Sequence, residues 1–254
     1  MKIIESTKNE WIKHIKKLEK KKYRDVENVY LIEGEHLVEE ALQNEGIIKH
    51  LIFTEEGSQN YPSLVERVND DNKVFVTPEV MKQLSLLPSV PSIMAVVEKN
   101  NQVVKETKTK HLLLLDQVQD PGNVGTMIRT ADAAGFQGVF LGEGSADIYN
   151  SKVLRSMQGS HFHINVTEGN LLEKIEDLKA DGYKIYATEL NPSAISYKDI
   201  PSSEKIAFIM GNEGQGVSKE VIEASHQPIF IPMLGKAESL NVGIAAGIVM
   251  FSLN

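Results

Sequence analysis

The fold of this chain is decided by the stretch Ile231-Pro232-Met233-Leu234-Gly235-Lys236-Ala237-Glu238-Ser239-Leu240-Asn241, which runs directly into Val242–Phe251. The pattern predicts a strand end, a polar loop and then a helix that Ser239 or Asn241 caps. Because Val242–Phe251 carries no charged or strongly polar side chain, we expect this helix to be buried on all sides. It is too short to cross a bilayer, which takes roughly 20 apolar residues. A large core or a partner subunit must therefore cover it.

The overall composition narrows the class of protein. A chain of 254 residues is long enough for two domains or one large one. It contains no cysteine, which excludes disulfides, zinc–thiolate sites and a thiol nucleophile. Residues 1–22 contain no apolar segment like that of a signal peptide, and no long apolar run occurs elsewhere. We therefore expect a soluble, cytoplasmic protein that does not bind membranes.

Charge is spread unevenly along the chain, whose net charge is −8. Residues 1–24 hold nine lysines and arginines against three glutamates, whereas the remainder holds 18 basic and 32 acidic residues. A basic segment on an acidic body suits contact with a polyanion at one place. A solvated helix is the alternative interpretation, and charge alone does not decide between them.

Residues 1–97 are expected to form a small α/β domain. A capping box at residues 7–10 predicts a first helix, and alternating segments follow it. The predicted strands are residues 29–33, 48–53, 73–76 and 93–97, and the predicted helices are residues 36–44, 63–68 and 78–84. No glycine-rich phosphate loop or acidic cluster occurs there, so binding is favoured over catalysis. The polar residues 98–110 are interpreted as a linker.

Residues 111–254 show a second α/β alternation. The predicted strands are residues 112–115, 139–141, 184–188, 206–210 and 229–231, and the predicted helices are residues 124–134, 151–160, 171–180 and 218–224. This order predicts a mainly parallel sheet covered on both faces. Ligands of such sheets bind beyond the carboxyl ends of the strands.

Three polar loops follow predicted strands and are candidates for chemistry. In the first, Asn123 is a potential helix cap after a turn at Pro121-Gly122, and Arg129 lies off the buried stripe, where it can reach back to grip a phosphate. The second spans residues 211–216, where glycines permit close backbone approach and Glu213 is a possible base or acceptor. The third is the opening stretch.

Other motifs are weaker. Residues 141–147 resemble a Rossmann glycine loop but lack its third glycine, and we interpret them as a turn. His161 and His163 would face the same way on a strand, yet no further metal ligand accompanies them, so no metal site is predicted. There is no Gly-x-Ser-x-Gly motif to support a hydrolase.

Taken together, the three loops resemble motifs one, two and three of the SpoU (TrmH) family of RNA ribose 2′-O-methyltransferases, within the SPOUT superfamily. The resemblance is carried by residues 123–131, 211–216 and 231–242 and covers residues 111–254. The first hundred residues resemble the ribosomal-protein-like substrate-binding domain of rRNA-modifying members. Gly243 departs from the pattern, since relatives often have serine or alanine there.

The resemblance implies a parallel sheet with a deep trefoil knot, a homodimer, and S-adenosyl-L-methionine held by backbone groups around Thr188, Gly211, Ile231 and Leu240. It implies methylation of a ribose 2′-hydroxyl, with ribosomal (23S) RNA favoured as the substrate. The residues expected to carry this chemistry, with the arginine supplied by the second subunit, are Asn123, Arg129, Glu213, Ser239 and Asn241. The alternatives are the same chemistry on tRNA, a Rossmann-type enzyme that uses Gly142 and Gly144, and a non-catalytic RNA-binding protein.

Overall fold

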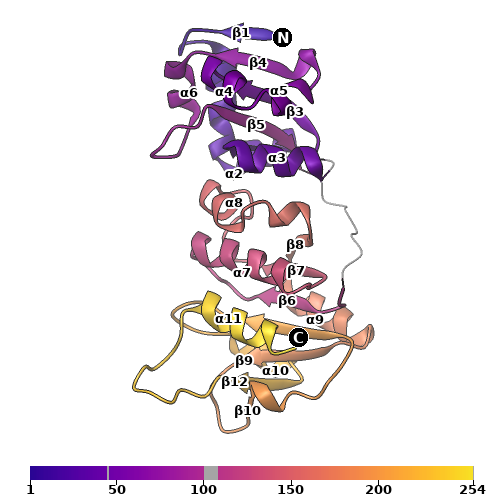
Figure 1. The fold of residues 1–254 in the computed structure, drawn as a ribbon. Coiled ribbons are helices and arrows are strands. Elements are labelled where there is room, and N and C mark those ends of the chain that lie inside the picture. The colour runs from indigo at the N-terminus through magenta and orange to yellow at the C-terminus, as the bar shows by residue number, and fades with distance from the viewer. Residues whose placement is uncertain (45, 100–107, 254) are drawn as a thin grey trace. The chain divides into compact units, whose positions relative to one another are not determined.

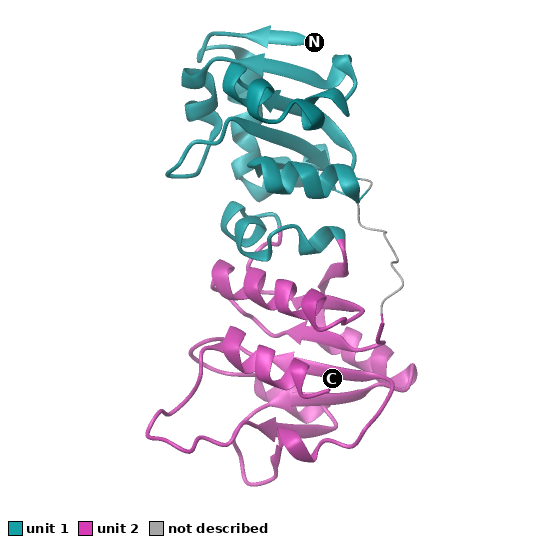
Figure 2. Ribbon diagram, in the orientation of Figure 1, with its two compact units in different colours: residues 1–100, 149–162 teal, residues 101–148, 163–254 magenta. Residues whose placement is uncertain are grey.

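The computed structural model describes residues 1–44, 46–99 and 108–253 and divides into two compact units (Figure 2). The first unit comprises residues 1–100 and 149–162, and the second comprises residues 101–148 and 163–254. Most of the predicted linker, residues 98–110, lies outside the described residues. Residues 149–162, which the sequence had grouped with the C-terminal domain, make their contacts within the first unit.

The first unit is built on a five-stranded sheet with the strand order β1-β4-β3-β5-β2 (Figure 1). Its strands are β1 (Lys2–Ile4), β2 (Val29–Glu33), β3 (Ile48–Phe53), β4 (Lys73–Val76) and β5 (Ile93–Glu98). Its helices are α1 (Glu10–Lys16), η1 (Lys17–Glu19), α2 (Lys21–Glu27), α3 (Glu35–Gln43), α4 (Glu55–Asn60), α5 (Pro62–Glu66), η2 (Asp70–Asn72), α6 (Pro78–Leu84), α8 (Ser151–Met157) and η3 (Ser160–Phe162). Strand β5 runs antiparallel to both of its neighbours.

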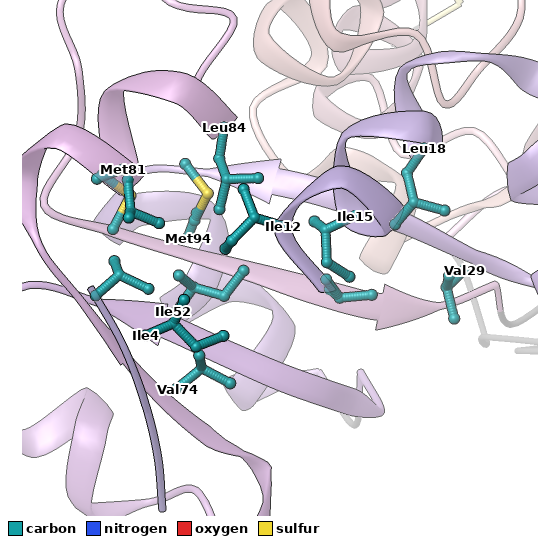
Figure 3. Close-up of a cluster of buried hydrophobic side chains, with 13 residues drawn as sticks. Ile4, Ile12, Ile15, Leu18, Val29, Ile52, Val74, Met81, Leu84 and Met94 are labelled. Carbon is teal, nitrogen blue, oxygen red and sulfur yellow. The ribbon is translucent and has the colours of Figure 1, made fainter. Parts of the chain in front are cut away.

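The basic segment at the start of the chain is anchored by an apolar stripe. Ile12, Ile15 and Leu18 are buried and point into a core formed with β3, β4 and α6 (Figure 3). The predicted capping box is wrong by two residues, because the side chain of Asn9 caps α1 by accepting a hydrogen bond from the Trp11 N–H at 2.9 Å. The buried stripe of the expected first helix is divided between α1 and η1, and α2 begins after a break in the helix at Lys20.

The second unit is built on a seven-stranded sheet whose strands pair in parallel, in the order β10-β12-β9-β11-β6-β7-β8. Its strands are β6 (Leu112–Leu115), β7 (Gly138–Gly142), β8 (Asn165–Gly169), β9 (Lys184–Thr188), β10 (Ile195–Ser196), β11 (Ile206–Met210) and β12 (Gln227–Phe230). Its helices are α7 (Pro121–Ala133), α9 (Leu171–Ala180), η4 (Tyr197–Asp199), α10 (Lys219–Ala224) and α11 (Val242–Phe251). The α/β class and the parallel sheet are therefore confirmed. All five residues of β11 are buried, so helices cover both faces of the sheet there.

Helix α11 is only partly covered within one chain. It packs against α7 and β11 and buries Gly243, Ala246, Val249 and Met250. Ile244 and Phe251, however, remain 58% and 49% exposed. The expectation that this helix is buried on all sides is therefore wrong for the single chain. Within the described ranges, no helix is both long and apolar enough to cross a membrane.

Candidate functional site

A cavity of about 690 Å³ lies at the carboxyl ends of β9, β11 and β12 in the second unit. Because these three strands are neighbours in a parallel sheet, the loops that leave them meet at one edge. The four positions expected to contact a cofactor all line the cavity: Thr188, Gly211, Ile231 and Leu240. Three residues of the predicted catalytic set also line it: Glu213, Ser239 and Asn241.

The loop at residues 211–216 is shaped by backbone contacts that only glycine permits at its start. Asn212 and Gly216 exchange two backbone hydrogen bonds, each 2.9 Å long. A Cβ atom on Gly211 would lie 2.1 Å from the carbonyl carbon of Gly216, far inside contact distance. The Oδ1 of Asn212 also accepts hydrogen bonds from the Gly214 and Gln215 N–H groups, at 2.9 and 3.1 Å. The loop is therefore a fixed turn with its backbone facing the cavity.

Glu213 ties this second loop to the first. Its Oε1 accepts hydrogen bonds from the Asp120 N–H at 3.0 Å and the Asn123 amide at 2.9 Å, and its Oε2 accepts from the Gln119 N–H at 3.2 Å. Partial burial alone would raise the pKa of Glu213, but these donors outweigh it and lower the pKa below the usual range. The carboxylate is thus ionised at neutral pH and occupied by donors, which favours a role as an acceptor over one as a base.

Asn123 and Asn241 extend this connection to the third loop. The Asn241 amide donates to the Asn123 Oδ1 at 3.0 Å, while its own Oδ1 caps α11 by accepting from the Gly243 and Ile244 N–H groups. Asn241, rather than Ser239, is therefore the cap. A Cβ atom on Gly243 would lie 3.2 Å from that capping oxygen, so the missing side chain leaves room for the arrangement.

The first loop differs from its prediction in one detail. Residues 121 and 122 are the opening of α7 rather than a separate turn, and Asp120 caps this helix by accepting from the Asn123 N–H at 3.0 Å. The prediction of Asn123 as the cap was wrong. The signal that would have found Asp120 is the proline after it, which favours the first helical position. Because Asp120 takes the cap, the side chain of Asn123 is available to Glu213 and Asn241.

Of the predicted site residues, Arg129 alone neither lines the cavity nor joins the described hydrogen bonds between the loops. It lies on the exposed side of α7 and is absent from the described lining of the cavity. Within the part of the chain that the structure describes, its guanidinium makes no hydrogen bond or ion pair. It is therefore available to a ligand or to another molecule.

The charged residues that line the cavity indicate the charge of the ligand it can bind. Three carboxylates line it, those of Glu189, Glu213 and Glu238, and none of the described lining residues is a lysine or arginine. Glu189 was missed by the sequence reasoning, although it directly follows Thr188 at the end of a predicted strand. Such a cavity suits a cationic ligand and disfavours a phosphorylated one.

The weaker motifs lie elsewhere. Gly142 ends β7 and Gly144 forms a turn after it, and neither lines the cavity. His161 is hydrogen-bonded to the Tyr30 hydroxyl at 2.9 Å, whereas His163 is paired with Asp132 at 2.8 Å. Neither histidine lies on a strand, contrary to expectation. Across residues 1–44, 46–99 and 108–253, no group of three or more His, Asp or Glu side chains is placed to hold a metal ion.

Comparison with known proteins agrees with this geometry. The SpoU rRNA Methylase family matches residues 110–251, which is more than half of the chain and includes all three loops. The chain belongs to the SpoU rRNA methylase family. A second family, the MRM3-like substrate binding domain, matches residues 9–95.

Relatives of this SpoU protein match along its whole length. The 23S rRNA (guanosine(2553)-2'-O)-methyltransferase RlmP of Bacillus subtilis (strain 168) is 45% identical over 260 residues, covering 100% of this chain and 99% of that protein. The crystal structure of an rRNA methyltransferase from Sinorhizobium meliloti has a TM-score of 0.89 at 29% identity, covering 99% of this chain and 96% of that one. An AdoMet-bound rRNA methyltransferase structure from the same organism has a TM-score of 0.87 at 30% identity, covering 99% and 97%.

Proposed function

We propose that this protein transfers the methyl group of S-adenosyl-L-methionine to a ribose 2′-hydroxyl of RNA, and that its substrate is 23S rRNA. The observation that carries the proposal is the cavity where Thr188, Gly211, Ile231 and Leu240 meet, at the positions that the family resemblance assigns to the cofactor. The 23S rRNA enzyme RlmP, 45% identical along the full chain, supports the choice of substrate. An rRNA substrate also supports a cytoplasmic location.

The residues around the cavity fit this cofactor. S-Adenosyl-L-methionine carries a positive sulfonium and no phosphate, which matches a cavity lined by three carboxylates and by no described lysine or arginine. The turn at residues 211–216 presents backbone groups at close range, as an adenosine group requires. When bound, the cofactor would supply an electrophilic methyl group for direct transfer to oxygen.

The chain's own residues would act mainly by positioning. Transfer from sulfur to the ribose O2′ needs no covalent enzyme intermediate, so correct placement supplies much of the acceleration. Asn123, Glu213 and Asn241 hold the three loops in register, and Ser239 faces the same cavity. Arg129 would hold an RNA phosphate through its planar fork. A guanidinium has no acceptor site and is not deprotonated in proteins, so it cannot act as the base, and the 2′-hydroxyl proton would leave to an RNA phosphate or to water.

Two features support a homodimer in which this site is completed. Ile244 and Phe251 leave an apolar strip of α11 exposed, and the Arg129 guanidinium on the adjacent helix α7 has no described partner in its own chain. A second copy placed over α11 would cover the strip and bring its own Arg129 to the cavity. We further propose that residues 231–251 form part of the trefoil knot typical of the family.

Calorimetric titration with S-adenosyl-L-methionine, followed by mapping of 2′-O-methylation in RNA from cells that lack the protein, tests the proposal. We expect binding to the purified protein and the loss of one mark from 23S rRNA. Absence of binding would contradict the enzymatic assignment. A mark lost from tRNA alone would overturn the choice of ribosomal RNA while leaving the chemistry intact.

A further inference from the structure

The basic segment near the start of the chain forms a defined surface, which we call the lysine ridge. It consists of the exposed residues Lys16, Lys17, Lys20, Lys21 and Lys22, which occupy the end of α1, η1, and the start of α2. We propose that the lysine ridge binds the phosphate backbone of the RNA substrate. This inference rests on the proposed function and assigns a surface that neither the cavity nor the matched families specify.

The ridge is held in shape by a buried cation. Arg24 is only 4% exposed, and its guanidinium donates to the backbone carbonyls of Leu18 and Glu19 at 2.6 and 2.7 Å. These bonds fix the turn between α1 and α2, while the buried Leu18 side chain anchors it from below. The neighbouring lysines are therefore displayed from a fixed backbone, and Arg24 itself acts as structural support rather than as an RNA contact.

Two of the acidic groups near the ridge are paired with residues outside it. Glu27 is paired with His14 at 2.8 Å and Asp25 is paired with Lys99 at 2.5 Å. Within the described residues, Lys16, Lys20 and Lys22 form no salt bridge. These three cations are therefore free to meet an external anion.

The arrangement also opposes local helix stability, which argues against a merely solvated surface. Lys21 and Lys22 lie in the first turn of α2, where the helix dipole disfavours positive charge, and that turn contains no acidic residue. A polyanion would relieve this penalty. Since the chain outside residues 1–24 is strongly acidic, the ridge is also where a nucleic acid would be attracted.

The test compares two variants with the same net charge. The ridge variant is Lys16→Gln, Lys20→Gln and Lys22→Gln, and the control variant is Lys82→Gln, Lys184→Gln and Lys219→Gln, in which the lost charges are scattered over the surface. Binding of protein-free large-subunit ribosomal RNA is measured by filter binding over a range of salt concentrations. Circular dichroism melting and calorimetry with S-adenosyl-L-methionine check folding and the cofactor site.

We expect the ridge variant to bind RNA roughly tenfold more weakly at low salt. The slope of log affinity against log salt should fall in magnitude by about 2, since each single-strand phosphate contact contributes about 0.7. The control variant should retain most of the affinity and slope. If both triple variants bind alike while the wild-type protein binds cofactor and methylates RNA, the ridge assignment is wrong. Failure of the wild-type protein to methylate RNA would instead overturn the proposed function.

Discussion

Glu213 illustrates how one carboxylate can organise a site without reacting in it. Its two oxygens receive two backbone N–H groups and one amide, so its charge is used to fasten residues 119–123 to the glycine turn. Replacing Glu213 with Gln would set an NH₂ group against the Gln119 N–H or the Asn123 amide. We expect Glu213→Gln to lose about 1 kcal/mol of unfolding free energy, since a charge-assisted hydrogen bond is discounted where it is solvent-exposed. Urea denaturation measures this loss, and Glu220→Gln on α10 is the control.

The effect of Glu213→Gln should also depend on pH. Because the folded pKa of Glu213 is lowered, its stabilising contribution is complete above the ordinary pKa of an unfolded glutamate and is lost as the pH falls through the folded pKa. The stability difference between the variant and the wild-type protein should therefore shrink in acid. A difference that grows as the pH falls would show that Glu213 is protonated in the folded protein.

A second prediction for a single residue concerns Arg129. Lysine keeps the charge of arginine but loses the planar fork that grips two phosphate oxygens. We expect Arg129→Lys to slow RNA methylation by roughly a hundredfold, the scale seen when a positioned donor is removed. Cofactor binding by calorimetry should stay unchanged, since Arg129 is proposed to hold an RNA phosphate and S-adenosyl-L-methionine carries none. Methylation at the wild-type rate would contradict the phosphate clamp.

Sequence reasoning found most of these residues but not all of their connections. Gly211, Glu213 and Asn241 stand out because glycine, carboxylate and amide follow predicted strands. The bond between Asn123 and Glu213 joins residues 90 positions apart, and no local pattern encodes it. The cap of α7 was assigned to Asn123 instead of Asp120 because both residue types favour that position.

At the scale of elements, buried strands were predictable and polar ones were not. Leu112–Leu115 and Ile206–Met210 are continuous apolar runs, and the structure has them with the predicted bounds. Strand β8, Asn165–Gly169, was missed because it is a partly exposed edge strand with little apolar alternation. Helix α4, Glu55–Asn60, was missed because it buries only a glycine and shows no apolar stripe.

The turn at residues 211–216 leads to a prediction about cofactor binding. Gly211→Ala would force a methyl group against the Gly216 backbone, and overpacking of this kind costs about 1–3 kcal/mol. If the turn shifts to absorb that strain, cofactor affinity should fall by about tenfold to a hundredfold. Gly235→Ala is the matched control, since a Cβ atom there would meet no described atom within 4 Å. Calorimetry that finds equal affinity in both variants would contradict the role given to this turn.

For the whole molecule, the sequence correctly predicted two α/β sheets but not the path of the chain between the units. Residues 149–162 belong by contact to the first unit, where Tyr149 packs on Tyr30 and His161 bonds to the Tyr30 hydroxyl. Helical periodicity over residues 151–157 predicts that a helix exists but not which core it joins. The proposed knot would be beyond the reach of sequence patterns for the same reason, since threading of the chain leaves no mark on local patterns.

The proposed homodimer can be tested at the exposed strip of α11. A charge placed on the exposed strip of α11 would have to be desolvated if a second copy covers that strip, and an unpaired buried charge is strongly destabilising. We therefore expect Ile244→Lys to convert a dimer into a monomer, measured by size-exclusion chromatography with light scattering. Leu172→Lys is the control, because Leu172 is an exposed apolar side chain on α9, away from the strip. If Arg129 acts across the interface, the Ile244→Lys monomer should also lose roughly a hundredfold in methylation, as Arg129→Lys does. A monomeric wild-type protein, or a monomeric variant with full activity, would show that each chain completes its own site.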